Sequence, residues 1–290
     1  MATTIQRSFS RFKSNLEITG LQVGAVSKRQ KGVRDAVAGQ LTVLTDFLTG
    51  SYSRSTLIAP LSKADIDIFV ILDSSYYYNY SDGKNGGQAG LLDRLRRCLI
   101  KTYPKSPRVS RSGQAVTITF TDFLVDVVPA FHRKGGGYLI PNALTSLWLE
   151  TDPKSHVSIM AKANAAHASD LVPMVKMIKA WNRSHSSLFR SFHLEVLALE
   201  VFEGITISDY PSGARYFFDK ARARVALKNP DPAGYGDDVG SYINVANAQA
   251  KLELAYDRAL KAEEFASRGA ISDAVGMWRL IFGDQFPAFG

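Results

Sequence analysis

Cysteine is nearly absent from this chain of 290 residues, which carries only Cys98. A single cysteine excludes an internal disulfide framework and a cysteine-rich zinc site. The histidines are few and show no spacing typical of metal ligands. They lie at positions 132, 156, 167, 185 and 193. We therefore expect a protein that functions in a reducing, cytoplasmic setting.

Long apolar runs are also missing. No stretch of 18 or more apolar residues occurs, so no membrane span and no membrane partner are expected. The first residues, MATTIQRSFSRFKSN, contain no apolar core of the kind that signal peptides have, so none is expected. The formal net charge of +8 favours polyanionic partners, among them nucleotides and nucleic acids.

The pattern of the chain changes near residue 150. Before it, the first forty residues read as helical, 41–48 as a helix end or a strand, and 76–90 as a loop. Strands are predicted at 65–72, 115–120 and 123–131, and an amphipathic helix at 91–103. After it, helices are predicted at 154–168, 171–182, 191–202, 214–227, 242–266 and 271–282. The expected fold is α+β, with a first domain at 1–150 and a helical lobe at 151–290.

Acidic residues occupy two of the predicted strands. Asp65 and Asp67 lie about 6–7 Å apart on one strand face and repel each other unless a cation sits between them. Asp126 lies inside the apolar run FLVDVVPAF, where an uncompensated charge is costly to bury. If the two strands are neighbours, the three carboxylates can hold two Mg²⁺ ions, the arrangement used for nucleotidyl transfer. The alternative is that Asp65 and Asp67 end a strand in solvent and that Asp126 forms an ion pair.

A Gly-Ser pair precedes these strands. Gly50 lets backbone N–H groups approach an anion closely, and the Ser51 hydroxyl adds a donor. A short helix beginning at Ser51 would favour phosphate at its N-terminus, and Arg54 would add positive charge. The alternative is a plain turn at the end of a strand.

The order and spacing of these motifs form a recognisable combination. Gly50-Ser51, thirteen intervening residues, Asp65-Ile66-Asp67 and a distant Asp126 resemble the signature of the DNA polymerase β-like nucleotidyltransferases. The segments GSYSRSTLIAPLSKADIDIFVIL, VDVVPAF, LIPN, MVKMIKAWNR and SFHLEVLALE are similar to those of the bacterial cGAS/DncV-like nucleotidyltransferases, or CD-NTases. The resemblance covers roughly residues 40–205 by motif and the remainder by architecture.

This resemblance implies a fold and an activity. The fold would be a nucleotidyltransferase core with a mixed sheet and a long N-terminal spine helix along both lobes. The active site would lie in the cleft between the core and the helical lobe. Family members join nucleoside triphosphates into cyclic di- or trinucleotides with release of pyrophosphate, using Mg²⁺ or Mn²⁺. Their products activate an effector protein in the antiphage systems called CBASS, in which accessory proteins also occur. ATP is an expected substrate.

The resemblance also implies roles for residues. Asp65, Asp67 and Asp126 would bind the metal, and Asp126 would help to take the proton of the attacking hydroxyl. The remaining matches are contacts to the triphosphate and to the base. The triphosphate contacts would be Gly50, Ser51, Arg54, Lys176, Lys179 and Ser191, and the base contacts Thr151, Asp152 and Phe192. The alternatives are a solvated face for the two lysines and a core position for Phe192.

Other functions fit parts of the same pattern. Transfer to an RNA end needs a long basic track, whereas the basic residues here are scattered, so no stable nucleic-acid partner is expected. Transfer to a protein or small molecule occurs in smaller relatives that usually lack a comparable helical half. A non-catalytic nucleotide sensor would not need three carboxylates. The bases used, the linkage, the ring size and the activating signal stay open.

Overall fold

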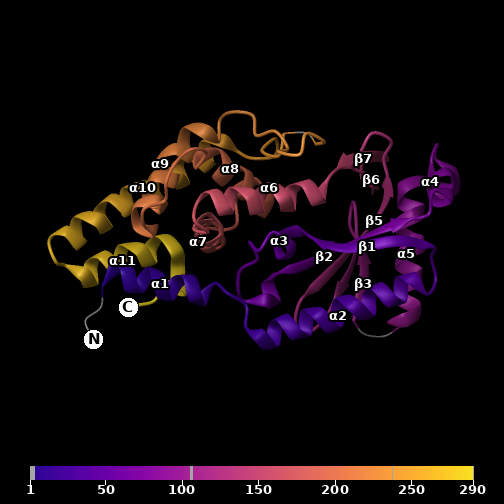
Figure 1. The fold of residues 1–290 in the computed structure, drawn as a ribbon, viewed down its shortest axis with the longest axis horizontal. Helices are drawn as coiled ribbons and strands as arrows, with labels where there is room; N and C mark the ends of the chain where they lie inside the picture. The colour runs from indigo at the N-terminus through magenta and orange to yellow at the C-terminus, as the bar shows by residue number, and fades with distance from the viewer. Residues whose placement is uncertain (1–3, 105–106, 237, 290) are drawn as a thin grey trace. The chain divides into compact units, whose positions relative to one another are not determined.

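The chain folds as two compact units in a computed structural model that describes residues 4–104, 107–236 and 238–289 (Figure 1). Unit 2 consists of Ile18–Ser55 and Ala59–Val157. Unit 1 consists of the residues up to Glu17, the short segment Thr56–Ile58, and the residues from Ser158 onward. The α+β class is confirmed, while the single boundary expected at residue 150 stays a prediction.

A mixed sheet forms the centre of unit 2, with strand order β1-β2-β5-β4-β3 and with β6 and β7 attached to β5. β2 and β5 are parallel, and the other neighbours are antiparallel. The strands are β1 (Val43–Thr49), β2 (Asp65–Leu72), β3 (Arg108–Arg111), β4 (Val116–Thr119), β5 (Leu124–His132), β6 (Tyr138–Asn142) and β7 (Leu147–Thr151). The strands expected at 65–72, 115–120 and 123–131 are confirmed, and 41–48 supplies most of β1. The sequence reasoning missed β3, β6 and β7.

Helices cover one face of this sheet. Because side chains alternate along a strand, Ile66, Ile68 and Val70 of β2 share one face, and all three are buried. The helix α2 contacts β2, and α5 contacts β3, β4 and β6 (Figure 1). The helices of unit 2 are α2 (Gly20–Ala38), α3 (Gly50–Ser53), α4 (Ser74–Tyr80), α5 (Gly87–Thr102) and the start of α6 (Pro153–Ala166). Short 3₁₀ turns occur at η1 (Leu61–Lys63) and η2 (Lys84–Gly86).

The other face of the sheet carries a smaller apolar cluster. Phe69 and Ile71 of β2 pack there with Val128 and Ala130 of β5, and with residues of β6. Phe69 lies two residues after Asp67, and Val128 lies two residues after Asp126, so the alternation puts the aspartates on this same face.

The N-terminal helical segment is two helices and not the single long helix that the sequence predicted. α1 (Ile5–Asn15) belongs to unit 1 and α2 to unit 2. Thr19 starts a new helix, because its Oγ1 accepts from the Gln22 N–H at 3.3 Å while Gln22 Oε1 accepts from the Thr19 N–H at 2.8 Å. This capping box satisfies backbone groups that a continuous helix would bond internally.

The segment 76–90 is also not the loop that its Gly, Asn and Asp content predicted. The Asp73 carboxylate caps α4 by accepting from the Ser75 N–H at 2.9 Å, and Tyr76 and Tyr80 are buried on one helix face. Gly90 lies inside α5, where a Cβ would stand 2.0 Å from the Asn85 carbonyl oxygen. Gly90 is thus explained by close packing inside a helix, whereas the sequence reasoning took the glycines of this segment as a sign of a loop.

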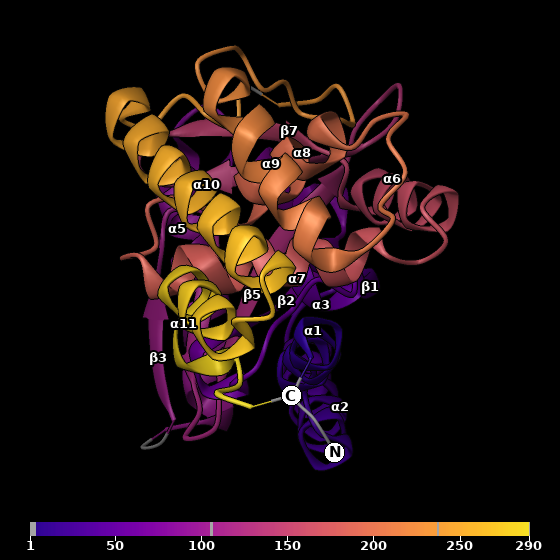
Figure 2. The same cartoon turned by 90° about the vertical axis from the view of Figure 1, so that its left-hand side faces the viewer.

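Unit 1 is helical, as expected after residue 150, and Figure 2 shows α9 beside α10. Its helices are α1, the rest of α6, α7 (Leu171–Ser184), α8 (Ser191–Val201), α9 (Tyr210–Arg224), α10 (Val245–Ser267) and α11 (Ile271–Phe282), followed by η3 (Gly283–Gln285). Aromatic rings from α1 and α11 hold the N-terminal helix in the core. Phe9 lies edge-on to Trp278 at 4.9 Å between ring centroids, and Phe12 lies 4.8 Å from Phe282. Among the described residues, no helix is both long and apolar enough to cross a membrane.

A buried histidine makes unit 1 sensitive to pH. His193 of α8 is 1% exposed, and its Nδ1 lies 3.1 Å from the Tyr242 hydroxyl. Loss of hydration is the largest cause that lowers the pKa of His193 to about 4, although Asp238 acts in the opposite direction. The unfolded chain therefore binds a proton at mildly acidic pH that the folded chain does not.

We expect the contribution of His193 to stability to be present above pH 6.5 and to be lost as pH falls toward 4. Between pH 7 and pH 5 the free energy of unfolding should fall by about 2 kcal/mol more in the wild type than in His193→Gln. Urea titrations of both proteins at the two pH values measure this difference. Equal losses in the two proteins would contradict the assignment.

Candidate active site

The pairing of β2 with β5 brings the three predicted aspartates together. The parallel register sets Asp67 opposite Asp126, and Asp65 opposite Leu124. Asp65 is two residues from Asp67, so all three carboxylates extend from the same face of the sheet. One oxygen of each lies within 4.8 Å of the others. Oxygen ligands at this spacing suit a hard divalent cation.

The environment of Asp126 differs from that of Asp65. Asp65 is exposed, whereas Asp126 is half-buried between β2 and β4. The Thr117 hydroxyl of β4 donates to Asp126 Oδ1 at 2.5 Å. Burial raises the pKa of Asp126, the Thr117 hydrogen bond opposes this change, and the negative charge of Asp65 adds to it. A bound cation would favour the ionised carboxylate and offset the repulsion.

Gly50 packs directly against the second aspartate. The register of β1 on β2 sets Thr49 opposite Asp67, and Gly50 follows at a backbone φ of +67°. A Cβ on Gly50 would stand 1.7 Å from Asp67 Oδ2. Glycine is therefore required here both by its left-handed backbone and by the carboxylate above it. The Gly-Ser turn and the acidic pair are parts of one site.

The short helix α3 begins at Gly50, one residue before the start at Ser51 that the sequence analysis considered. It spans Gly50–Ser53, with Arg54 as its C-cap, and Ser51 and Arg54 are both half-buried. The phosphate contacts expected of Ser51 and Arg54 stay predictions.

The two lysines predicted on the helical lobe are buried in unit 1, so the alternative of a solvated face is wrong. Lys179 Nζ donates to Glu195 Oε1 at 2.6 Å and to the Thr56 carbonyl oxygen at 3.0 Å. The Thr56 hydroxyl also donates to Glu195 Oε1, at 2.8 Å. Lys176 donates to both carboxylate oxygens of Glu17 at 2.7 Å.

The sequence reasoning missed Thr56 and Glu195. A signal for Glu195 was present, because an acidic residue inside the apolar helix SFHLEVLALE needs a buried partner. Nothing comparable marks Thr56, whose contact with Lys179 joins residues far apart in the chain. Lys179 is thus already paired with the Glu195 carboxylate, and its predicted contact with the triphosphate stays a prediction.

The other predicted contacts lie at the ends of elements. Ser191 is exposed at the first position of α8, and Phe192 beside it is half-buried. Thr151 ends β7 opposite Tyr138. Asp152 caps α6, because its carboxylate accepts from the Ser155 N–H at 3.2 Å and from the Ser155 hydroxyl at 2.6 Å. The base and triphosphate roles of these residues stay predictions.

A family model gives this geometry its context. The model described as the Second Messenger Oligonucleotide or Dinucleotide Synthetase domain, SMODS, matches residues 3–164. This chain belongs to the SMODS family. The match includes Gly50, Ser51 and the three aspartates. The CD-NTase resemblance is thus confirmed, and this SMODS protein is a nucleotidyltransferase enzyme of the cyclic oligonucleotide synthase kind.

Curated relatives of this SMODS protein are similar over most of its length. It is 25% identical to a cyclic AMP-AMP-AMP synthase of an Acinetobacter species, over 98% of this chain and 86% of the relative. It is 24% identical to a probable cyclic nucleotide synthase of Bacillus cereus, over 82% of this chain and 81% of the relative.

Solved structures share the fold of this SMODS protein. The structure of Escherichia coli CdnC with ATP matches at a TM-score of 0.69 and 20% identity, over 97% of this chain and 98% of CdnC. The structure of Bradyrhizobium diazoefficiens CdnG with GTP matches at a TM-score of 0.72 and 15% identity, over 96% of this chain and 95% of CdnG.

Replacement of Gly50 tests whether the turn and the acidic pair form one site. Gly50→Ala would force the Asp67 carboxylate out of position and strain a left-handed backbone. We expect the rate of pyrophosphate release from nucleoside triphosphates to fall by roughly a hundredfold or more, since small displacements of catalytic groups have effects of this size.

Gly24→Ala is the matched control. Gly24 lies in α2, and a Cβ there would meet nothing within 4 Å, so activity should be unchanged and the helix slightly more stable. Equal activity of Gly50→Ala and Gly24→Ala would show that Asp67 needs no glycine beside it.

Proposed function

We propose that this enzyme joins nucleoside triphosphates into a cyclic di- or trinucleotide by two-metal-ion catalysis, as part of bacterial antiphage defence. The observation that carries this proposal is the convergence of Asp65, Asp67 and Asp126, with Gly50 packed on the Asp67 carboxylate. Family membership gives the class of enzyme, and the carboxylates support the mechanism.

The three carboxylates fit a pair of divalent cations. They supply only oxygen ligands, and they lie close enough to share an ion. Asp65, Asp67 and Asp126 would hold Mg²⁺ or Mn²⁺, which when bound polarises phosphoryl oxygens and stabilises the charge of the leaving pyrophosphate.

The chain's own groups would orient the substrates and move the proton. The turn at Gly50 and Ser51 would bind the phosphates through backbone N–H groups and the serine hydroxyl. Asp126 would accept a proton from the attacking hydroxyl, because a bound cation would keep this carboxylate ionised and able to act as a base. Arg54, Lys176, Lys179 and Ser191 are proposed triphosphate contacts. Thr151, Asp152 and Phe192 are proposed base contacts.

Names of similar proteins suggest the substrates and partners. The Acinetobacter relative is named for a product that contains only AMP, and CdnC was solved with ATP, so ATP is our first candidate. CdnC was also solved as a complex with a HORMA protein. We propose that this chain uses an accessory protein of that kind, and that its product activates a separate effector in the cytoplasm.

We expect Asp65→Ala combined with Asp67→Ala to abolish synthesis, because loss of the metal site removes several kcal/mol of transition-state stabilisation. Each protein is incubated with single nucleoside triphosphates and with mixtures, with Mg²⁺ or Mn²⁺, and the products are treated with phosphatase. The wild type should give a phosphatase-resistant product of two or three nucleotides.

Residual turnover of the double variant above about 1% of the wild type would overturn the metal assignment, given a loss of several kcal/mol. Wild-type activity on added RNA, without a phosphatase-resistant product, would instead indicate a terminal nucleotidyltransferase. Denaturation curves of both proteins serve as the control for folding.

A further inference from the structure

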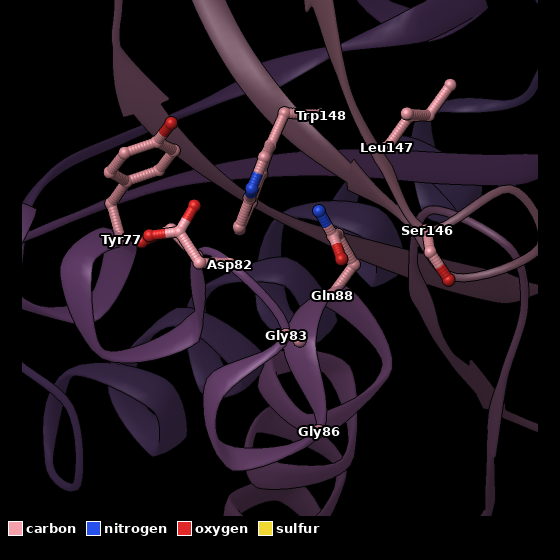
Figure 3. A pocket seen from close by; sticks show the side chains of 10 residues that line it. Tyr77, Asp82, Gly83, Gly86, Gln88, Ser146, Leu147 and Trp148 are labelled. Carbon is pink, nitrogen blue, oxygen red and sulfur yellow. The ribbon is translucent and has the colours of Figure 1, made fainter.

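A pocket lies within unit 2, between α4, the start of α5 and the β6–β7 turn (Figure 3). Its volume is about 580 Å³, within the range of pockets that hold small molecules. Tyr77, Asp82, Gln88 and Trp148 are among the residues that line it. None of them belongs to the predicted catalytic set.

The pocket lies on the opposite face of the sheet from the aspartates. Tyr77 and Trp148 both contact Phe131 of β5, with ring centroids 5.6 Å away in each case. Phe131 is five residues after Asp126, so alternation along β5 turns the two side chains to opposite faces. Five residues of a strand also correspond to about 16 Å along the chain. A ligand here would not touch the metal site.

Gln88 is the feature that points to a ligand. Gln88 is 8% exposed, and in the described part of the chain no group forms a hydrogen bond with its amide. Figure 3 shows this amide directed into the pocket, between Trp148 and Ser146. The amide faces the pocket without a protein partner, so a ligand with a donor and an acceptor on one edge could form two hydrogen bonds with it.

The walls around Gln88 select a flat, largely uncharged group. The Trp148 and Tyr77 rings lie 5.1 Å apart at an angle of 50°, so a planar ligand would stack on one of them and not between them. Gly86, the N-cap of α5, supplies no side-chain hydrogen bond to the first turn of the helix, and the Gly87 N–H donates to the Lys84 carbonyl oxygen. The Asp82 carboxylate disfavours phosphate inside the pocket.

We propose that this pocket binds the purine base of a nucleoside or nucleotide. The Gln88 amide would bond the base edge in the two-point manner that suits adenine, and Trp148 would stack on the ring. The phosphates of a nucleotide would stay outside, beyond Asp82. The source of the base is a free nucleoside triphosphate or the cyclic product, and either would give the enzyme a nucleotide-binding site separate from catalysis.

Tryptophan fluorescence tests this directly. Of the three tryptophans, Trp181 and Trp278 are at most 1% exposed, so quenching by a stacked base reports on Trp148. Titrations of the full chain in EDTA use adenosine, guanosine and cytidine, and then ATP and a cyclic triadenylate. We expect saturable quenching by a purine nucleoside at lower concentration than by cytidine. A stronger effect of ATP or of the cyclic triadenylate identifies the source.

Gln88→Met should raise the Kd for the purine nucleoside by about tenfold, through loss of the amide hydrogen bonds. Asp65→Ala combined with Asp67→Ala should leave this Kd unchanged. Absence of quenching by both purine nucleosides, equal affinity for cytidine, or an unchanged Kd in a folded Gln88→Met would overturn the proposal. The titrations need no metal and no turnover, so their failure would leave the proposed function intact.

Discussion

The parallel pairing of β2 with β5 is the constraint on which the site depends. It sets Asp67 directly opposite Asp126, and it leaves Asp65 on the same face. A slip of one residue would turn Asp126 toward the helices and bury its charge among the apolar side chains of the other face. The apolar side chains of β2 and β5 fix this register, because each strand has a helix-facing row that is fully buried. Packing of the core thus determines the geometry of the carboxylates.

Electrostatic repulsion in this arrangement is concentrated at one face of the sheet. Three carboxylates lie close together, and burial raises the pKa of Asp126 even though Thr117 donates a hydrogen bond to it. Gly50 completes the same face, since its missing side chain makes room for the Asp67 carboxylate. Repulsion among the three carboxylates favours a bound cation. The proposed metal chemistry therefore uses the same cluster of negative charge that is unfavourable without a cation.

The two faces of the sheet would have different uses. One carries the carboxylates, and the other, through Phe131, supports the aromatic wall of the pocket around Gln88. In unit 1 the buried pair of Lys179 and Glu195 follows the general rule that a charge in a core keeps a partner. A triphosphate would have to compete with the Glu195 carboxylate for Lys179.

The sequence alone determined the elements with strong periodicity, because a buried strand or amphipathic helix shows its core-facing side chains locally. This group contains the strands DIDIFVIL and FLVDVVPAF and the helices after residue 150. The spacing of the motifs also predicted that the three aspartates and Gly50-Ser51 belong to one site. Tertiary structure decided what depends on residues distant in the chain. The Thr19 capping box divides the N-terminal helix, close packing at Gly90 allows a helix in a glycine-rich segment, and Lys179 finds Glu195 and Thr56. Gln88 looks like an ordinary helical residue until folding places it in the wall of the pocket that Trp148 also lines, which no local pattern records.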